Sequence, residues 1–349
     1  MSGNAIGEWP RVESARLLEM ARANGVLSAL DQQFSLRLAA LYGEKEPGIH
    51  WALAIASRQE AAGHVCADLS RLVADGLVVE RHGETEVHPL LATSDSLEDW
   101  LAELRESPLV SLASSRGSER GTPRPLVLDE RGRLYLRRAH GSQSKLAERI
   151  RERAGRDDLD VDRGLAETGI ERLMDAGSTG LASDEGDRED EAPRSALRVA
   201  LSRPLAIVTG GPGTGKTTLV SRLVVLLIEQ ALAKGRSVPR VRLLAPTGKA
   251  AAAMAASFAR QRESLDLPDG IREALPRTAE TIHRALHPQT RLDAFGRPLP
   301  FSLADDIVIV DEASMVDLEL MARLFDACRD VERLVLLGDP DQLTSVQAG

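Results

Sequence analysis

The sequence predicts an α/β fold, in which a nucleotide-binding domain built on a parallel β-sheet follows a mostly helical N-terminal domain. From residue 193 onward, apolar runs of strand length alternate with helical patterns, which is typical of a parallel sheet covered on both faces. A complete phosphate-binding loop separates the first of these runs from a helical pattern. Before residue 105, apolar residues recur near the helical period, which indicates short amphipathic helices.

Composition narrows the function classes. The 349 residues suffice for two or three domains, and the formal net charge of −9 disfavours a protein that coats nucleic acid, although a local basic groove is compatible with it. Cys66 and Cys328 lie far apart and outside any metal-ligand spacing, so we expect neither a disulfide framework nor a zinc site. Because we find no signal-peptide pattern and no apolar run long enough for a bilayer, we expect a cytoplasmic protein without membrane spans.

Changes in pattern divide the chain into four regions. Residues 1–105 are expected to form the helical N-terminal domain. Residues 106–154 hold two short strand patterns around a Gly-containing turn and then a polar helix, which predicts a small mixed β-hairpin and helix piece. Residues 155–192 have little to bury, so we expect an acidic, disordered linker. Residues 193–349 hold the nucleotide-binding domain. The strands expected there are Leu205–Val208, Val241–Leu244, Ile307–Val310 and Leu334–Leu337.

The phosphate-binding loop carries the most specific chemistry. It follows G-x-x-x-x-G-K-[ST] at every defined position, and its glycines let the backbone approach phosphate oxygens. Lys216 is expected to reach the β- and γ-phosphates of a nucleoside triphosphate, and Thr217 to hold Mg²⁺. The alternative is a glycine-rich turn with an unrelated Lys-Thr pair; the flanking strand and helix patterns favour the phosphate site. The residues expected to bind nucleotide are Gly210, Gly211, Pro212, Gly213, Thr214, Gly215, Lys216, Thr217 and Thr218.

Two further strand ends carry side chains that suit hydrolysis of the nucleotide. Asp311 is expected to support Mg²⁺ through water, and Glu312 to orient or deprotonate the attacking water. Gln342 follows the next strand pattern, where its amide is expected to contact the γ-phosphate and distinguish ATP from ADP. The alternative in each case is a polar turn after a buried strand, and the phosphate loop upstream favours the catalytic interpretation. The expected catalytic residues are therefore Lys216, Glu312 and Gln342.

A second group of residues is expected to contact nucleic acid. Pro246, Thr247 and Lys249 lie where the second strand pattern meets a helix, and the N–H groups of a helix start suit a nucleic-acid phosphate. His283 is expected to stack on a base or contact the nucleic-acid backbone. Alternatively, Lys249 is an ordinary surface lysine and His283 a polar residue on an exposed helix face.

These blocks, in this order, resemble the RecD-type branch of the superfamily 1 helicases, the family of the alpha subunit of bacterial exodeoxyribonuclease V. The residues that carry the resemblance are GGPGTGKTT, APTGKAA, TIHRAL, VIVDEASMVDLELMARL and LLGDPDQLTSVQAG. All five blocks lie within residues 205–349. The stretches His64–Leu69 and Pro125–Arg138 resemble the N-terminal region of the family more loosely.

The resemblance implies a RecA-like P-loop NTPase domain, with ATP and Mg²⁺ as cofactors, and an N-terminal domain that binds partners. It implies an ATP-dependent 5′-3′ DNA helicase subunit of a RecBCD-type exonuclease V complex, acting in double-strand break repair and recombination. RecB and RecC homologues and single-stranded DNA would be its partners. The alternatives are another superfamily 1 DNA helicase, either stand-alone RecD-like or relaxase-linked, and an ATP-binding scaffold subunit without motor activity.

The chain departs from the pattern of the family in three places. Pro193-Arg194-Ser195 occupies the zone where relatives usually carry a glutamine that reads adenine, and the polar Ala139–Ser142 replaces an aromatic-containing segment. The sequence ends at Gly349, whereas the family uses a second RecA-like domain to supply a transition-state arginine, typically worth roughly 10³–10⁵ in rate. We therefore expect residues 193–349 to be a first RecA-like domain, incomplete at its C-terminus and inactive on its own.

Overall fold

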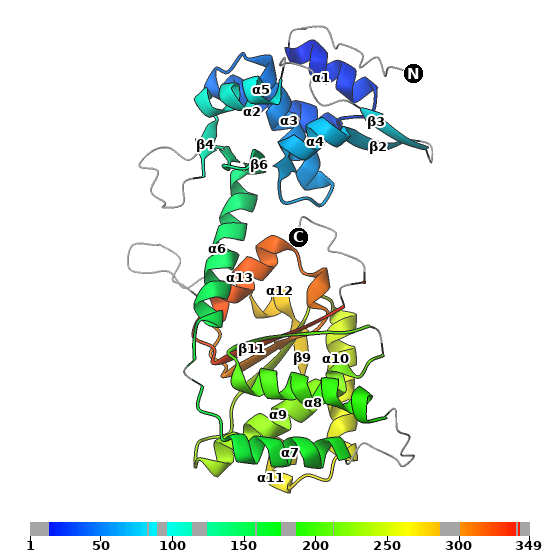
Figure 1. Cartoon of the computed structure of the whole chain (residues 1–349), viewed down its shortest axis with the longest axis vertical. Helices are drawn as coiled ribbons and strands as arrows, with labels where there is room; N and C mark the ends of the chain where they lie inside the picture. Colours follow the sequence, from blue (N-terminus) through cyan, green and yellow to red (C-terminus); the bar gives the residue numbers. More distant parts are fainter. Residues whose placement is uncertain are drawn as a thin grey trace. The chain divides into compact units, whose positions relative to one another are not determined.

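The computed structural model divides the chain into two compact units, and the boundary falls between Ser144 and Lys145, within helix α6 (Arg137–Ala154). Each unit has its own hydrophobic packing, and Figure 1 labels many of the elements of both. In the part of the chain that the structure describes, no helix is long and apolar enough to cross a membrane. The described residues are 14–81, 84–88, 96–113, 124–157, 159–175, 186–211, 213–286, 301–339 and 341–342.

Helices form most of the first unit. They are α1 (Ser14–Ala23), α2 (Ala29–Tyr42), α3 (Pro47–Ala61), α4 (Leu69–Asp75) and α5 (Leu97–Glu106). The central helix is α3, which buries Trp51 and most of its other residues. The start of α2 is fixed by a capping box, because the Ser28 hydroxyl accepts from the N–H of Asp31 while the Asp31 carboxylate accepts from the N–H of Ser28. The helix ends at Gly43, which adopts a left-handed conformation with φ of 68°.

Two small sheets complete the first unit. One has the order β1-β6-β5-β4, and the other is an antiparallel pair of β2 and β3. The expected hairpin is present, with β5 and β6 antiparallel on either side of a turn in which Gly132 has φ of 75°. The strands are β1 (Ala67–Asp68), β2 (Leu77–Arg81), β3 (Glu84–His88), β4 (Val110–Leu112), β5 (Leu126–Leu128) and β6 (Arg133–Leu136).

These strands add to one expectation about the N-terminal part and correct another. Residues 1–105 are mostly helical as expected, but β1, β2 and β3 also lie within them. Residues 106–154 are not a separate piece, because Leu126 and Leu134 pack into the same core as α3 and α5. Short strands of this kind carry too few residues for a clear alternation, so the helical stripes around them dominated the prediction.

The expected linker is largely folded. Two helices, α7 (Arg163–Asp175) and α8 (Gly186–Ser202), occupy much of residues 155–192, while residues 176–185 lie outside the described chain. Ile170 and Leu173 of α7 are buried in the core of the second unit, while Glu171 and Asp175 of the same helix are exposed. The prediction of a disordered linker is therefore wrong for α7 and for the start of α8, and the nucleotide-binding unit begins at Lys145 rather than at residue 193.

The second unit is built on one five-stranded sheet in which every neighbouring pair is parallel, with the order β7-β11-β10-β8-β9. The four predicted strands are confirmed. The fifth, β9, was not predicted, because it has only three half-buried residues, Ala-Glu-Thr. The strands are β7 (Leu205–Thr209), β8 (Val241–Ala245), β9 (Ala279–Thr281), β10 (Ile307–Val310) and β11 (Arg333–Gly338).

Helices cover both faces of this sheet. The side chains of β10 alternate, so that Ile307 and Ile309 join one core while Val308 and Val310 join the other. The first core also contains α7 and α8, together with α9 (Lys216–Ala233), α10 (Gly248–Ser264) and α11 (Asp269–Ala274). The second core contains α12 (Ile282–Ala285) and α13 (Leu318–Ala327). The result is the doubly covered parallel sheet that the sequence predicted.

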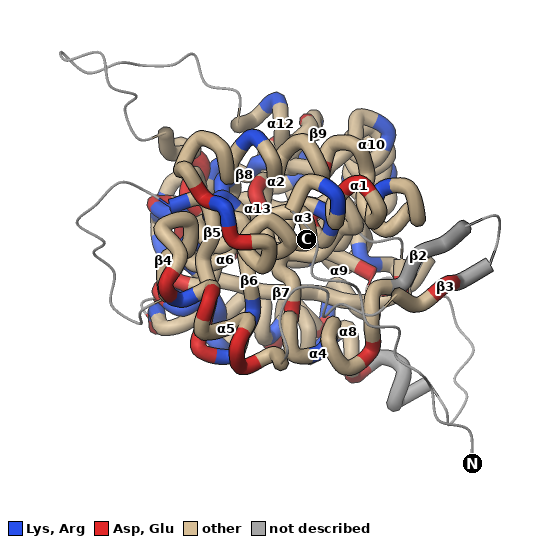
Figure 2. Tube along the Cα trace, turned by 90° about the horizontal axis from the view of Figure 1, so that it is seen from above, with Lys and Arg blue, Asp and Glu red and all other residues tan. Residues whose placement is uncertain are grey.

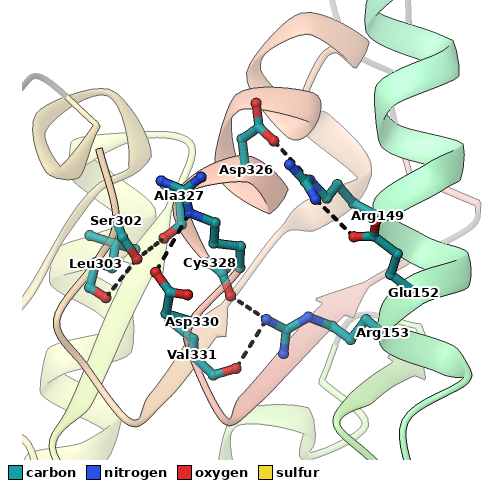
Figure 3. A network of polar contacts seen from close by, with 11 residues as sticks. Arg149, Glu152, Arg153, Ser302, Leu303, Asp326, Ala327, Cys328, Asp330 and Val331 are labelled. Carbon is teal, nitrogen blue, oxygen red and sulfur yellow. Dashed lines mark hydrogen bonds and ion pairs between the residues drawn. The ribbon is translucent and has the colours of Figure 1, made fainter. Parts of the chain in front are cut away.

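Two arginines attach the C-terminal part of α6 to the rest of the second unit (Figure 3). Arg153 is 5% exposed and donates hydrogen bonds to the carbonyl oxygens of Pro204 (3.2 Å), Val331 (3.1 Å) and Cys328. One turn earlier, Arg149 Nε donates to Asp326 Oδ1 at 2.9 Å, at a position more open to solvent. The last turns of α6, which belong to the second unit, are therefore fixed to the loops before β7 and β11.

Candidate nucleotide site

All five strands of the second unit end at one edge of its sheet, and each expected site residue follows one of these ends. Because the strands are parallel, the residues after β7, β11 and β10 meet at this edge, and the residues after β8 and β9 continue it. The parallel register of β8 and β9 places Ala245 opposite Thr281. The topology therefore gathers residues that are more than a hundred positions apart in sequence.

The phosphate loop follows β7 and leads into α9. Gly213 and Gly215 have φ of 76° and 79°, a left-handed backbone that other residues adopt only with strain. Thr214 Oγ1 donates to Gly211 O at 2.9 Å and closes the turn. The N–H of Gly210 donates to Gly338 O at 3.3 Å, so the loop begins on the last rung of the β7–β11 ladder. Pro212 lies outside the described residues.

The Lys216 side chain folds back over this loop. Its Nζ donates to Gly211 O at 2.8 Å and to Gly210 O. Thr217 lies in the first turn of α9, whose N-cap, Gly215, provides no capping side chain, so the N–H groups of this turn are free of a side-chain cap. An anion is the natural ligand for an ammonium group and a helix N-terminus placed together. Thr218 differs, because its hydroxyl accepts a hydrogen bond from Gln261 Nε2 at 3.4 Å.

The carboxylate pair follows β10, next to the phosphate loop. The N–H of Asp311 donates to Leu244 O at 2.9 Å, and Asp311 Oδ1 accepts from the N–H of Glu312 at 2.9 Å. Burial raises the pKa of Asp311, and this effect is only partly offset by that hydrogen bond and by the positive charge of Lys216. The positive charge of Lys216 thus acts directly on the Asp311 carboxylate. Among the described residues, Glu312 is the non-glycine residue with positive φ, at 52°.

Gln342 lies in the turn after β11. Its backbone N–H donates to Asp339 O at 3.3 Å, and its side chain is exposed. Asp339 is 5% exposed, and its Oδ1 accepts from the N–H of Asp341 at 3.0 Å. The turn is therefore held by a buried carboxylate, which the sequence motif did not identify as important.

The expected nucleic-acid contacts lie at the outer end of the same edge. Thr247 is the N-cap of α10, where its Oγ1 accepts from the N–H of Ala250 at 3.2 Å, and Lys249 is exposed. His283 is exposed on α12, whose N-cap, Thr281, was not predicted although it plays the same part as Thr247. Pro246 is half-buried. Figure 2 marks Lys and Arg residues along α10 and α12.

Comparison with known proteins adds family relationships. Residues 193–348 match the model of an AAA domain, and residues 23–135 match the model of the RecBCD enzyme subunit RecD, N-terminal domain. The chain is 37% identical over 325 residues to the RecBCD enzyme subunit RecD of Mycolicibacterium smegmatis, covering 93% of this chain and 51% of that protein. It is 37% identical over 346 residues to the protein of that name from Mycobacterium tuberculosis H37Rv, covering 97% of this chain and 52% of that protein. The chain belongs to the RecD family.

A further relative of this RecD-family chain is the ATP-dependent RecD2 DNA helicase of Deinococcus radiodurans, 30% identical over 331 residues, which are 92% of this chain and 36% of that protein. The chain spans about half the length of the RecBCD subunits it matches. The match to the RecD N-terminal domain falls on the first unit, and the AAA match begins at Pro193, inside α8. Helix α7 therefore belongs to the second core but lies outside both matches.

The donor atoms of this RecD-family site suit a nucleotide-bound Mg²⁺. Thr217 and Asp311 offer hard oxygen donors, and Mg²⁺ commonly takes one or two protein ligands and completes its shell with phosphates and water. The described residues contain no group of three or more His, Cys, Asp or Glu side chains that could hold a metal ion.

Proposed function

We propose that this chain carries the ATP-hydrolysing part of a 5′-3′ DNA helicase subunit in a RecBCD-type exonuclease V complex that acts in double-strand break repair and recombination. The observation that supports this most strongly is the meeting of the phosphate loop, the Asp311-Glu312 pair and the Gln342 turn at one edge of a parallel sheet. Phosphoryl transfer to water depends mainly on positioning and charge stabilisation, and these residues provide both.

Each residue has a defined part in this proposal. Lys216 leaves the carbonyl oxygens of its own loop and binds the β- and γ-phosphates of ATP. Thr217 and Asp311 would hold Mg²⁺, which when bound would neutralise charge on the phosphates. Glu312 orients the attacking water and accepts its proton, and Gln342 contacts the γ-phosphate through its amide.

The outer end of the edge is proposed to bind single-stranded DNA. Lys249 and the N-terminal N–H groups of α10 contact a phosphate, Thr247 fixes the start of that helix, and Pro246 shapes the approach. His283 contacts a base or the backbone from the neighbouring helix, since the parallel register of β8 and β9 brings the two helix starts to one edge. We further propose that the protein works in the cytoplasm, with RecB and RecC homologues as partners of the first unit.

The test uses the full-length gene product and compares two identical substitutions at opposite edges of the sheet. Glu312→Gln should lower the DNA-stimulated ATPase rate at least about 100-fold, because it removes the general base, while ATP still binds. Glu332→Gln, at the residue just before β11 on the opposite edge, should leave the rate unchanged. ATP binding without DNA-stimulated turnover in the unsubstituted protein would instead indicate a scaffold subunit.

A second candidate function is a stand-alone RecD2-type helicase, favoured by the 30% identity to the Deinococcus radiodurans protein over 92% of this chain. Co-purification with RecB and RecC homologues from the same organism separates the two candidates. A stable complex supports the subunit assignment. ATP-dependent unwinding by protein that does not associate with them supports the stand-alone enzyme.

A further inference from the structure

Ser314 is a half-buried serine whose hydroxyl is not used by the fold. It lies two residues after Glu312, in the short helix η1 (Ala313–Met315). Its Oγ is closed off from solvent and has no hydrogen-bond partner among the described residues. The buried hydroxyls of Ser221 and Ser35 contrast with it, because they donate to Thr218 O at 2.7 Å and His50 O at 2.6 Å. A buried hydroxyl without a partner costs stability, so its presence needs a reason outside the packing of this state.

The surroundings of Ser314 connect the three parts of the nucleotide site. Its neighbour is Gly338, the last residue of β11: a Cβ atom at Gly338 would lie 3.5 Å from Ser314 N and 3.9 Å from Ser314 Oγ. The carbonyl oxygen of Gly338 accepts from Gly210, where the phosphate loop begins. The next residue, Asp339, accepts from the N–H of Gln342. The unused hydroxyl therefore lies where the turns carrying Glu312 and Gln342 meet.

We propose that Ser314 is a positioning residue that couples the Glu312 turn to the Gln342 turn when nucleotide occupies the phosphate loop. Its hydroxyl then forms a hydrogen bond with the Gln342 side-chain amide, which can serve as donor or acceptor. In the structure this amide is exposed and the hydroxyl has no partner among the described residues, so both groups are available for the bond. The inference rests on the proposed function, because it assigns Ser314 a role in transmitting the state of that same site.

This role predicts effects of opposite sign on stability and on catalysis. Without nucleotide, Ser314→Ala removes an unsatisfied polar group and should raise the melting temperature of the full-length protein by about 1–3 °C. During turnover it removes a hydrogen bond that holds the catalytic turns, so kcat should fall about 3- to 10-fold. KM for ATP should stay within about two-fold, because the contacts of Lys216 and Thr217 with the phosphates are unchanged. If Ser314 had only a structural role, Ser314→Ala would lower both the melting temperature and kcat.

The experiment is a double-mutant cycle for kcat, with Ser314→Ala, Gln342→Ala and the double variant in the full-length protein. Coupled residues give a double variant no slower than Gln342→Ala alone. The inference is overturned if the fold-loss in kcat of the double variant equals the product of the two single losses. It is also overturned if Ser314→Ala leaves kcat unchanged. Ser302→Ala is the matched control. The Ser302 hydroxyl donates to Ala327 O, at a distance of 3.3 Å, and takes no part in the proposed site, so kcat of this variant should be unchanged. If the unsubstituted protein shows no ATP turnover, the proposed function itself fails, which is a different result from failure of the coupling alone.

Discussion

Replacing Arg153 by methionine tests how strongly α6 is fixed to the nucleotide-binding unit. Arg153 is 5% exposed and donates to three backbone carbonyl oxygens, those of Pro204, Cys328 and Val331. Each such hydrogen bond contributes about 0.5–1.5 kcal/mol net, so losing all three should cost about 2–4 kcal/mol of unfolding free energy. For a unit of this size, that corresponds to a fall in melting temperature of about 5–15 °C. Methionine keeps much of the apolar stem, so the loss reports mainly on the hydrogen bonds.

The matched control is the same substitution one turn earlier on the same helix. Arg149 bridges Asp326 and Glu152, but its side chain is 31% exposed, and partly exposed ion pairs contribute at most about 1 kcal/mol. Melting of the full-length protein, together with hydrogen exchange of the β7 and β11 amides, measures the effect where Arg153 acts. If Arg149→Met destabilises these strands as much as Arg153→Met, the argument from buried carbonyls is wrong.

Three further predictions concern the loop, the nucleic-acid edge and the first unit. Gly215→Ala should weaken nucleotide binding about 5- to 30-fold in a fluorescent-nucleotide titration, since φ of 79° is strained for alanine. Gly235→Ala carries similar strain at the far end of α9 (φ 65°) and should leave affinity unchanged. Lys249→Ala should weaken single-stranded DNA binding and reduce the slope of log K against log salt by about 0.7, measured by anisotropy; an unchanged slope would mean that Lys249 touches no phosphate. At Asp129, burial raises the pKa, but the backbone N–H and guanidinium of Arg133 outweigh it and hold the pKa below its ordinary value of 3.8. The folded-state pKa of Asp129 is therefore lower than the pKa of the same group in the unfolded chain. The ionised carboxylate stabilises the folded protein fully at pH values above the unfolded-state pKa, and this stabilisation is lost as the pH falls through the folded-state pKa. Asp129→Asn should therefore destabilise the protein at pH 7, and the difference from wild type should shrink below about pH 4 in urea unfolding.

The strands, and the position of the expected site residues at their ends, could be predicted because both depend on residues that are neighbours in sequence. Val308-Ile309-Val310 is apolar throughout, as a strand buried on both faces requires, and Asp311 follows it directly. Once the strands are parallel, their ends must share an edge, so the meeting of Lys216 with Asp311 also follows from the pattern.

Other features depend on contacts between distant segments, which no local pattern contains. Ser314 resembles any serine in a turn until η1 is placed against Gly338. Helix α7 was missed because acidic residues dominate its neighbourhood, although Ile170, Leu173 and Met174 have helical spacing. The short strand β9 is identified by its pairing with β8, since three residues are too few to show a period.

The hydrogen bond from Gly210 to Gly338 has a consequence for how the site tolerates change. Because the first residue of the loop belongs to the sheet ladder, its position is set by the same lattice that places the Gln342 turn. The middle of the loop, by contrast, is shaped by its own glycines, Gly213 and Gly215, whose backbone is left-handed. A change that shifts the end of β11 would therefore move the start of the loop and the Gln342 turn together, whereas a change at Gly213 or Gly215 would act on the loop alone.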